Sequence, residues 1–150
     1  MNDGLDNAEG NLICSVSDCI YAGGTQSGDE YIISDLLGTG TFGQVFKCQK
    51  SGTKEIVAIK VVKNKPAYYN QGLLEIKLIQ TLNSTFDPKN EKFIVRLLDS
   101  FEYKGHICLA FELLSISLLD ILTQNQFRGL PLHIVHRFLK QVDFVSLYSL

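Results

Sequence analysis

The apolar residues between positions 31 and 62 fall into three short segments separated by turn residues. Segments 31–37, 45–50 and 55–62 alternate apolar and polar positions or are rich in β-branched residues, which predicts three strands. Glycines join the first two segments and the turn 51–54 joins the last two. Connections this short favour an antiparallel meander.

After Pro66 the apolar residues recur at the three- and four-residue spacing of a helix, and the polar segment 83–92 predicts a loop. Two more strands are predicted at 93–101 and 106–111, joined by a turn at Lys104-Gly105. The apolar residues of the predicted helix are Leu73, Leu74, Ile76, Leu78, Ile79 and Leu82.

The last third of the chain has the apolar spacing of helices, at 116–122 and again at 132–142. The predicted order is therefore three strands, a helix, two strands and then helices, which is an α+β fold without internal repeats. Residues 1–30 are rich in Gly, Asn, Asp and Ser, so we expect them to form a mostly flexible leader.

Charge is unevenly distributed along this chain of 150 residues and net charge −2. All Lys and Arg residues lie in 47–150, where they are scattered and form no patch. This pattern argues against nucleic-acid binding. The acids of residues 1–46, which contain no Lys or Arg, are Asp3, Asp6, Glu9, Asp18, Asp29, Glu30 and Asp35.

The cysteines form no CxxC pair, and the three His residues offer no companion set of metal ligands. Free thiols in a reducing compartment are expected, and no metal site is predicted. The sequence shows no secretory signal and no apolar run of membrane-spanning length. A soluble protein of the cytoplasm or nucleus, without a membrane partner, is expected. The cysteines are Cys14, Cys19, Cys48 and Cys108.

The segment from Gly38 to Val45, GTGTFGQV, matches a glycine-rich phosphate loop of the form GxGxxG. In dinucleotide-binding proteins such glycines lead into a helix and an acid follows about twenty residues later. Here a strand follows the glycines, and a base, Lys60, stands at the comparable distance. The pattern therefore favours a hairpin that folds over a nucleoside triphosphate, where glycines let the backbone approach the phosphates.

Two further residues extend this pattern. Val57-Ala-Ile-Lys60 matches the VAIK motif, whose lysine reaches the α- and β-phosphates from the third strand. A lysine in a cleft needs a counter-charge, and Glu75 on the predicted helix is positioned to provide one.

With these motifs the chain resembles the eukaryotic protein kinases over residues 31–142, and it is most similar to the Yak-type dual-specificity tyrosine-regulated kinases. The finer likeness rests on segments 2–7, 62–69, 111–114 and 126–130. The resemblance implies a kinase N-lobe with a five-stranded antiparallel sheet and one helix, followed by a hinge and the first helices of an incomplete C-lobe. The implied divisions are leader 1–30, N-lobe 31–111, hinge 112–115, start of C-lobe 116–142 and divergent tail 143–150.

The resemblance also implies a set of site residues. Lys60 and Glu75 would form the catalytic ion pair, Phe111 would be the gatekeeper, and the backbone of Glu112 and Leu114 would bond the adenine edge. Asp120 is a candidate near the ribose. The implied ATP contacts are Leu37, Gly38, Thr39, Gly40, Thr41, Phe42, Gly43, Val45, Ala58, Lys60, Phe111, Glu112 and Leu114.

The motifs that hold Mg²⁺ and orient the acceptor hydroxyl in kinases do not occur in this sequence. His136-Arg137-Phe138 has Phe in place of the Asp of HRD, and Asp143-Phe144-Val145 has Val in place of the Gly of DFG. Both also lie where a helix is expected. We therefore expect Mg²⁺ ligands only in a complete enzyme, with weak ATP binding and no turnover by these residues alone.

Three functions remain open at this point. One is the ATP-binding part of a Ser/Thr or dual-specificity kinase that phosphorylates protein hydroxyls. Another is a non-enzymatic regulatory fragment that binds a protein partner through its N-lobe or its exposed helices. A dinucleotide-binding module is the least favoured, because a strand follows the glycines.

Overall fold

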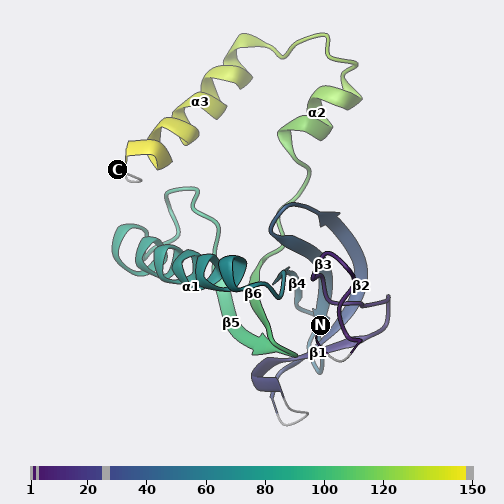
Figure 1. Ribbon diagram of the computed structural model, residues 1–150. Coiled ribbons are helices and arrows are strands. Elements are labelled where there is room, and N and C mark those ends of the chain that lie inside the picture. Colours follow the sequence, from purple (N-terminus) through teal and green to yellow (C-terminus); the bar gives the residue numbers. More distant parts are fainter. Residues whose placement is uncertain (1, 3, 25–27, 148–150) are drawn as a thin grey trace.

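The computed structural model describes residues 2, 4–24 and 28–147 (Figure 1). Its strands and helices follow one another in a sequence that matches the predicted one, with two short additions near the N-terminus. In chain order the elements are β1 (Cys19–Tyr21), η1 (Ala22–Gly24), β2 (Glu30–Thr39), β3 (Gly43–Lys50), β4 (Ile56–Val62), α1 (Pro66–Thr81), η2 (Leu82–Phe86), β5 (Leu97–Tyr103), β6 (His106–Glu112), α2 (Leu118–Gln124) and α3 (Leu132–Leu147).

The strands form one antiparallel sheet in the order β1-β2-β3-β4-β6-β5. This sheet with its helices confirms the predicted α+β class. The expected number of five strands was wrong, because β1 adds a sixth. β1 is only three residues long, too short to give a periodic pattern, and it exists through pairing with β2.

The curled sheet has a core on each face. Alternation along β4 sends Val57, Ile59 and Val61 into the larger core, where each is at most 2% exposed. The opposite face of the sheet is covered by α1, where Ile107 and Leu109 of β6 meet the helix. Ala58 and Lys60 belong to this second face by the same alternation. The strand that builds the core therefore also positions the lysine.

Helix α1 begins at Pro66, seven residues before the first apolar residue used to predict it. Proline suits the first helical turn because the missing N–H has no partner there in any helix. Gly72 is buried where α1 crosses the sheet, and a Cβ there would lie 3.2 Å from Ile107 Cγ2. The helix thus approaches β6 more closely than a larger residue would allow.

Other element boundaries also differ from the predicted ones. β5 begins at Leu97 and not at 93, because Phe93 has a left-handed backbone (φ 59°) that ends any strand there. The predicted loop 83–92 opens with the π-helical turn η2. The backbone of α3 continues through 143–147, part of the expected divergent tail, while positions 148–150 lie outside the described residues.

The described part of the leader packs against the sheet, although the sequence predicted mostly flexible residues. Leu12 is 2% exposed and Ile20 is fully buried, both within the larger core. The apolar residues of 12–22 follow no regular period, so no sequence pattern marks Leu12 and Ile20 as core residues. They are buried because the leader packs on the curled sheet.

Helices α2 and α3 extend beyond the sheet at the end where β6 leaves it (Figure 1). In the described part of the chain, no helix is long and apolar enough to cross a membrane.

Candidate functional site

The glycine segment joins β2 to β3 as a tight turn. Gly40 N–H donates to Gly43 O at 2.8 Å, and Lys63 N–H donates to Phe42 O at 3.0 Å, which ties the turn to the end of β4. Because the glycines connect two strands and lead into no helix, the dinucleotide-binding arrangement is excluded.

Lys60 and Glu75 meet beneath this turn. The Nζ atom of Lys60 lies 2.6 Å from Oε1 and 2.7 Å from Oε2 of Glu75, so the carboxylate holds the ammonium group with both oxygens. Their side chains are 22% and 29% exposed. A pair this accessible contributes little net stability but leaves the ammonium group oriented and reachable for an anionic ligand.

The tip of the glycine turn also reaches the helix. The Phe42 ring packs edge-to-face against the Tyr68 ring of α1, with ring centroids 6.0 Å apart. Lys60 Nζ lies 6.0 Å from the centroid of the same Phe42 ring, within range of a cation–π attraction. No sequence pattern marks Tyr68 as a site residue, since its role depends on the glycine turn folding onto the first turn of α1.

An apolar pocket of about 400 Å³ lies where the sheet passes into α2. Six of the predicted site residues or candidates come from distant segments to line it: Leu37, Ala58, Phe111, Glu112, Leu114 and Asp120. Four further lining residues were not predicted, although two of them lie within the predicted hinge 112–115 and a third lies just past it. The complete lining is Leu37, Ala58, Val95, Phe111, Glu112, Leu113, Leu114, Ser115, Ser117 and Asp120.

Glu112 is fixed at the edge of this pocket by Arg96. Glu112 N–H donates to Arg96 O at 3.1 Å, and Arg96 N–H donates to the Glu112 carboxylate at 2.9 Å. The Arg96 guanidinium in turn pairs with buried Asp87 at 3.2 Å. Since its N–H is already used, Glu112 could offer only its backbone carbonyl to a ligand in the pocket.

The remaining predicted contacts lie outside the pocket lining. Val45 pairs with Lys60 across the β3–β4 ladder, which places it on the same side of the sheet as the ion pair. Gly38 and Thr39 at the end of β2, and Gly40 and Thr41 in the turn, are all exposed. Their part in phosphate binding remains a prediction.

Asp120, the candidate ribose contact, has a structural role. Its Oδ2 atom accepts from Ser117 N–H at 2.8 Å and from the Ser117 hydroxyl at 2.6 Å, while Asp120 N–H donates to Ser117 Oγ at 3.1 Å. This is a capping box for α2. The bonds from Ser117 hold the pKa of the Asp120 carboxyl below its usual value.

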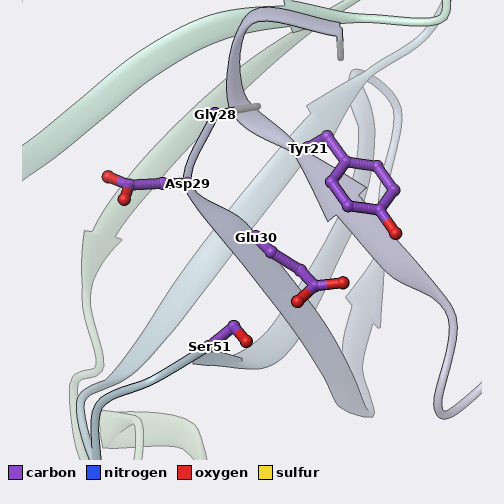
Figure 2. Close-up of a pocket in the computed structure, with 5 residues that line it drawn as sticks. All are labelled: Tyr21, Gly28, Asp29, Glu30 and Ser51. Carbon is purple, nitrogen blue, oxygen red and sulfur yellow. The ribbon is translucent and has the colours of Figure 1, made fainter. Parts of the chain in front are cut away.

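A second, polar pocket of about 430 Å³ lies at the edge of the sheet between β1 and β2 (Figure 2). Glu30 lies between Tyr21 and Ser51, and Asp29, the residue before β2, points away from them. Hydrogen bonds from Ser51, Cys19 and Tyr21 lower the pKa of Glu30, and the bond to Glu30 raises the pKa of Tyr21 to about 12. Two carboxylates would repel phosphates, so this pocket is no nucleotide site.

No group of three or more His, Cys, Asp or Glu side chains that could hold a metal ion occurs among the described residues. The residues present therefore give Mg²⁺ no ligand set, and no chemical step can be assigned to the ion here.

A glycine hairpin, a lysine–glutamate pair and a hinge-side apolar pocket thus occupy one face of the sheet. Residues 31–143 match the model of the protein kinase domain family. The chain belongs to the protein kinase family. The kinase chain covers the part of the domain that includes the sheet, α1 and the beginning of the helical region.

Its relatives include Yak-type kinases. The chain is 48% identical over 141 residues to Serine/threonine-protein kinase ppk15 of Schizosaccharomyces pombe, covering 94% of this chain and 26% of that protein. It is 43% identical over 141 residues to Dual specificity protein kinase YAK1 of Saccharomyces cerevisiae, covering 94% and 17%. To mouse Homeodomain-interacting protein kinase 1 it is 46% identical over 114 residues, covering 76% and 9%. The chain thus spans about a quarter or less of these relatives.

Proposed function

We propose that this chain is the ATP-binding portion of a protein Ser/Thr kinase of the dual-specificity type, which transfers the γ-phosphate of ATP to protein hydroxyls. The observation that carries the proposal is the pair of short bonds from Lys60 Nζ to both oxygens of Glu75, beneath a glycine turn. A glycine-rich turn next to an oriented lysine–glutamate pair is the combination that the kinase type of nucleotide phosphate site uses.

Adenine would enter the apolar pocket between Ala58 and Leu114, with the carbonyl of Glu112 at its polar edge. The phosphates would then extend under the glycine turn toward Lys60, whose ammonium group would bond their oxygens. Glu75 would keep the lysine side chain extended, so that little side-chain entropy is lost on binding. A protein substrate stays a prediction from the resemblance, and a location in the cytoplasm or nucleus stays a prediction from the sequence.

These residues alone are expected to bind ATP weakly and to transfer no phosphate. His136-Arg137-Phe138 is part of the helix α3, where backbone groups are committed to helical bonds, and it carries no Asp. Without metal ligands or a group that orients the acceptor hydroxyl, the charge of the phosphates would be only partly compensated.

Replacing Lys60 with Met tests the proposal directly. The variant keeps the length and packing of the side chain but removes the ammonium group, so its affinity for ATP should fall roughly tenfold to a hundredfold, as for a lost charged hydrogen bond. Titration calorimetry measures the change. Lys77→Met is the matched control, because Lys77 lies on the exposed side of α1, two residues past Glu75, and its loss should leave affinity unchanged.

The catalytic half of the proposal needs a second preparation, in which the chain is fused to the catalytic lobe of a kinase relative. Phosphate transfer to a protein substrate should appear in that fusion and disappear in its Lys60→Met form. Transfer that survives the substitution would contradict the assigned role of Lys60.

A regulatory fragment that binds a protein partner is the second candidate. Its support is an apolar groove of about 270 Å³ between α2 and α3, lined by Leu118, Leu122, Leu130, Val135, Phe138, Leu139 and Val142. A partner that co-purifies in equal amount, and does so equally well with Lys60→Met, would favour this function over ATP binding.

A further inference from the structure

His106 is a fully buried histidine at the start of β6 whose two ring nitrogens both have partners. Nδ1 lies 2.7 Å from the backbone carbonyl oxygen of Val62, and Nε2 lies 2.8 Å from Oδ1 of Asp6 in the leader. Asp6 is itself only 6% exposed. A histidine and a carboxylate 100 positions apart in sequence are thus enclosed together.

The partners of this ring fix its protonation. A carbonyl oxygen only accepts, so Nδ1 must carry a hydrogen; an ionised carboxylate also only accepts, so Nε2 must carry one too. Both hydrogens are present only in the imidazolium form. The alternative is a protonated Asp6 that donates to a neutral ring.

The hydrogen bonds that Asp6 accepts favour its ionised form. The amide of Asn2 donates to Oδ1 at 3.1 Å and the amide of Asn64 donates to Oδ2 at 3.1 Å, so both carboxylate oxygens are occupied as acceptors. Burial raises the pKa of Asp6, but the bonds from His106, Asn2 and Asn64 outweigh it and hold that pKa below the usual value. The pair is therefore imidazolium and carboxylate.

The pair fastens the leader to the linker between β4 and α1, which consists of residues 63–65. Val62 ends β4, and Asn64 N–H donates to Gly10 O of the leader at 2.8 Å. A weaker contact, 3.5 Å, joins Lys63 Nζ to the exposed Glu9 carboxylate. The linker leads from the strand of Lys60 into the helix of Glu75, so the leader is held at the junction between the two halves of the ion pair.

We propose that Asp6 and His106 act as a proton-dependent clamp, which holds the leader on the β4–α1 linker while the imidazole carries both hydrogens and releases it when one is lost. A neutral ring has a single N–H, so either the Val62 carbonyl or the Asp6 carboxylate would lose its donor inside the protein. Docking thus takes up a proton at His106, and rising pH favours release.

At the acid end, docking weakens as pH falls through the depressed pKa of Asp6. The closed clamp therefore needs an ionised Asp6 and a hydrogen on each ring nitrogen of His106. Charged groups on the elements packed around His106 include Glu9 and Asp18 of the leader, Lys60 of β4, Lys63 and Lys65 of the linker, Asp99 and Glu102 of β5, Lys104 of the β5–β6 turn and Glu112 of β6.

Hydrogen exchange at two neighbouring amides tests the clamp in the full chain. Asn64 N–H bonds the leader at Gly10 O, whereas Lys63 N–H bonds the glycine turn at Phe42 O. Between about pH 5 and pH 9, which spans imidazole titration, the protection factor of Asn64 should fall roughly tenfold to a hundredfold while that of Lys63 stays level. Constant protection at Asn64, or parallel loss at both amides, would overturn the proposal.

Asp6→Asn removes the carboxylate charge with little change of shape. Asn64 protection should then be low and independent of pH. Two control variants should keep the wild-type pH profile: Glu9→Gln, which removes the peripheral ion pair, and His133→Gln, which removes an exposed histidine of α3. An Asp6→Asn profile that matches wild type would contradict the clamp.

Nitrogen-15 spectra of the imidazole ring test the same point without any substitution. Hydrogens on both Nδ1 and Nε2 of His106 are expected at neutral pH. A ring with one unprotonated nitrogen in the docked state would refute the charged pair.

One consequence rests on the proposed function: release of the leader should loosen α1 and weaken ATP binding through Glu75. ATP affinity measured at the same pH values, in wild type and Asp6→Asn, separates the two ideas. If ATP never binds while Asn64 protection still follows pH, the proposed function fails and the clamp stands. If ATP binds with unchanged affinity while Asn64 protection ignores both pH and Asp6→Asn, the clamp fails and the function stands.

Discussion

At the scale of single residues, Gly43 shows how little space the glycine turn leaves. A Cβ at this position would lie 2.1 Å from Val61 O, and the backbone has φ +155°. Gly38, in the same turn, would meet nothing within 4 Å. The three glycines therefore differ in role. A Cβ at Gly43 would clash with β4, whereas Gly38 and Gly40 leave unfilled space beside the backbone.

Gly43→Ala should accordingly lower the free energy of unfolding by about 1–3 kcal/mol, because the strand must shift or remain strained. Gly38→Ala is the matched control and should change stability by less than about 0.5 kcal/mol, as for an ordinary surface substitution. Urea unfolding measures both. Equal effects of the two substitutions would contradict the close contact with Val61.

The Lys60–Glu75 pair is the second feature at the scale of single residues. The two side chains are held 2.6 Å apart while remaining partly open to water. Exposed pairs of this kind contribute between zero and about 1 kcal/mol, so the geometry is better explained by orientation of the lysine than by stability.

At the scale of elements, α2 depends on its N-terminal cap. The helix is seven residues long, too short to be stable alone, and the Ser117–Asp120 capping box satisfies the backbone N–H groups of Ser117 and Asp120. Both residues also line the apolar pocket, so the cap forms part of the lining of the proposed adenine site.

Ser117→Ala should weaken α2 by about 1 kcal/mol, the usual value of an N-cap side chain. Amide exchange at Ile121, whose N–H bonds Ser117 O at 3.1 Å, reports the loss. Thr123→Ala is a suitable control, since its hydroxyl bonds Leu119 O and caps nothing. If both variants leave Ile121 equally protected, the cap does not stabilise the helix.

The cap also has a defined pH dependence. The pKa of Asp120 is lowered in the folded chain, so its contribution is complete above the unfolded value and is lost as pH falls through the folded one. Exchange at Ile121 should therefore quicken, relative to its intrinsic rate, only in acid. The opposite sign would show that Asp120 is not held as an anion.

At the scale of the whole molecule, the two faces of the sheet are filled whereas α2 and α3 leave apolar side chains in water. Leu119 is 64% exposed, Leu139 54% and Val142 60%. Side chains gathered in this way favour association with any apolar surface, including a second copy of the chain.

Leu139→Lys should therefore reduce self-association of the 150-residue chain by about tenfold, the factor expected for one Leu side chain removed from a buried contact. Light scattering against protein concentration measures it. Val16→Lys is the control, because Val16 is 62% exposed but stands outside the α2–α3 groove. A chain that stays monomeric with Leu139 intact would contradict the expectation.

Much of the site could be predicted because its signals are local. Gly38 to Val45 and Val57 to Lys60 each combine spacing with strand alternation, and that alternation put Lys60 on the face of α1. Features that depend on contacts between distant segments were less predictable from the sequence than these local motifs. Neither Val95 nor Tyr68 carries any pattern that marks it as a neighbour of the pocket or of Phe42.

The sequence by itself determined the order of strands and helices and the residues that carry the kinase likeness, since turn residues and apolar spacing act over a few positions. The tertiary structure alone decided that the leader adds β1 to the sheet and that Asp6 meets His106 across 100 positions. Such contacts exist only once the sheet has curled and excluded water from both groups, and no short stretch of sequence encodes that enclosure.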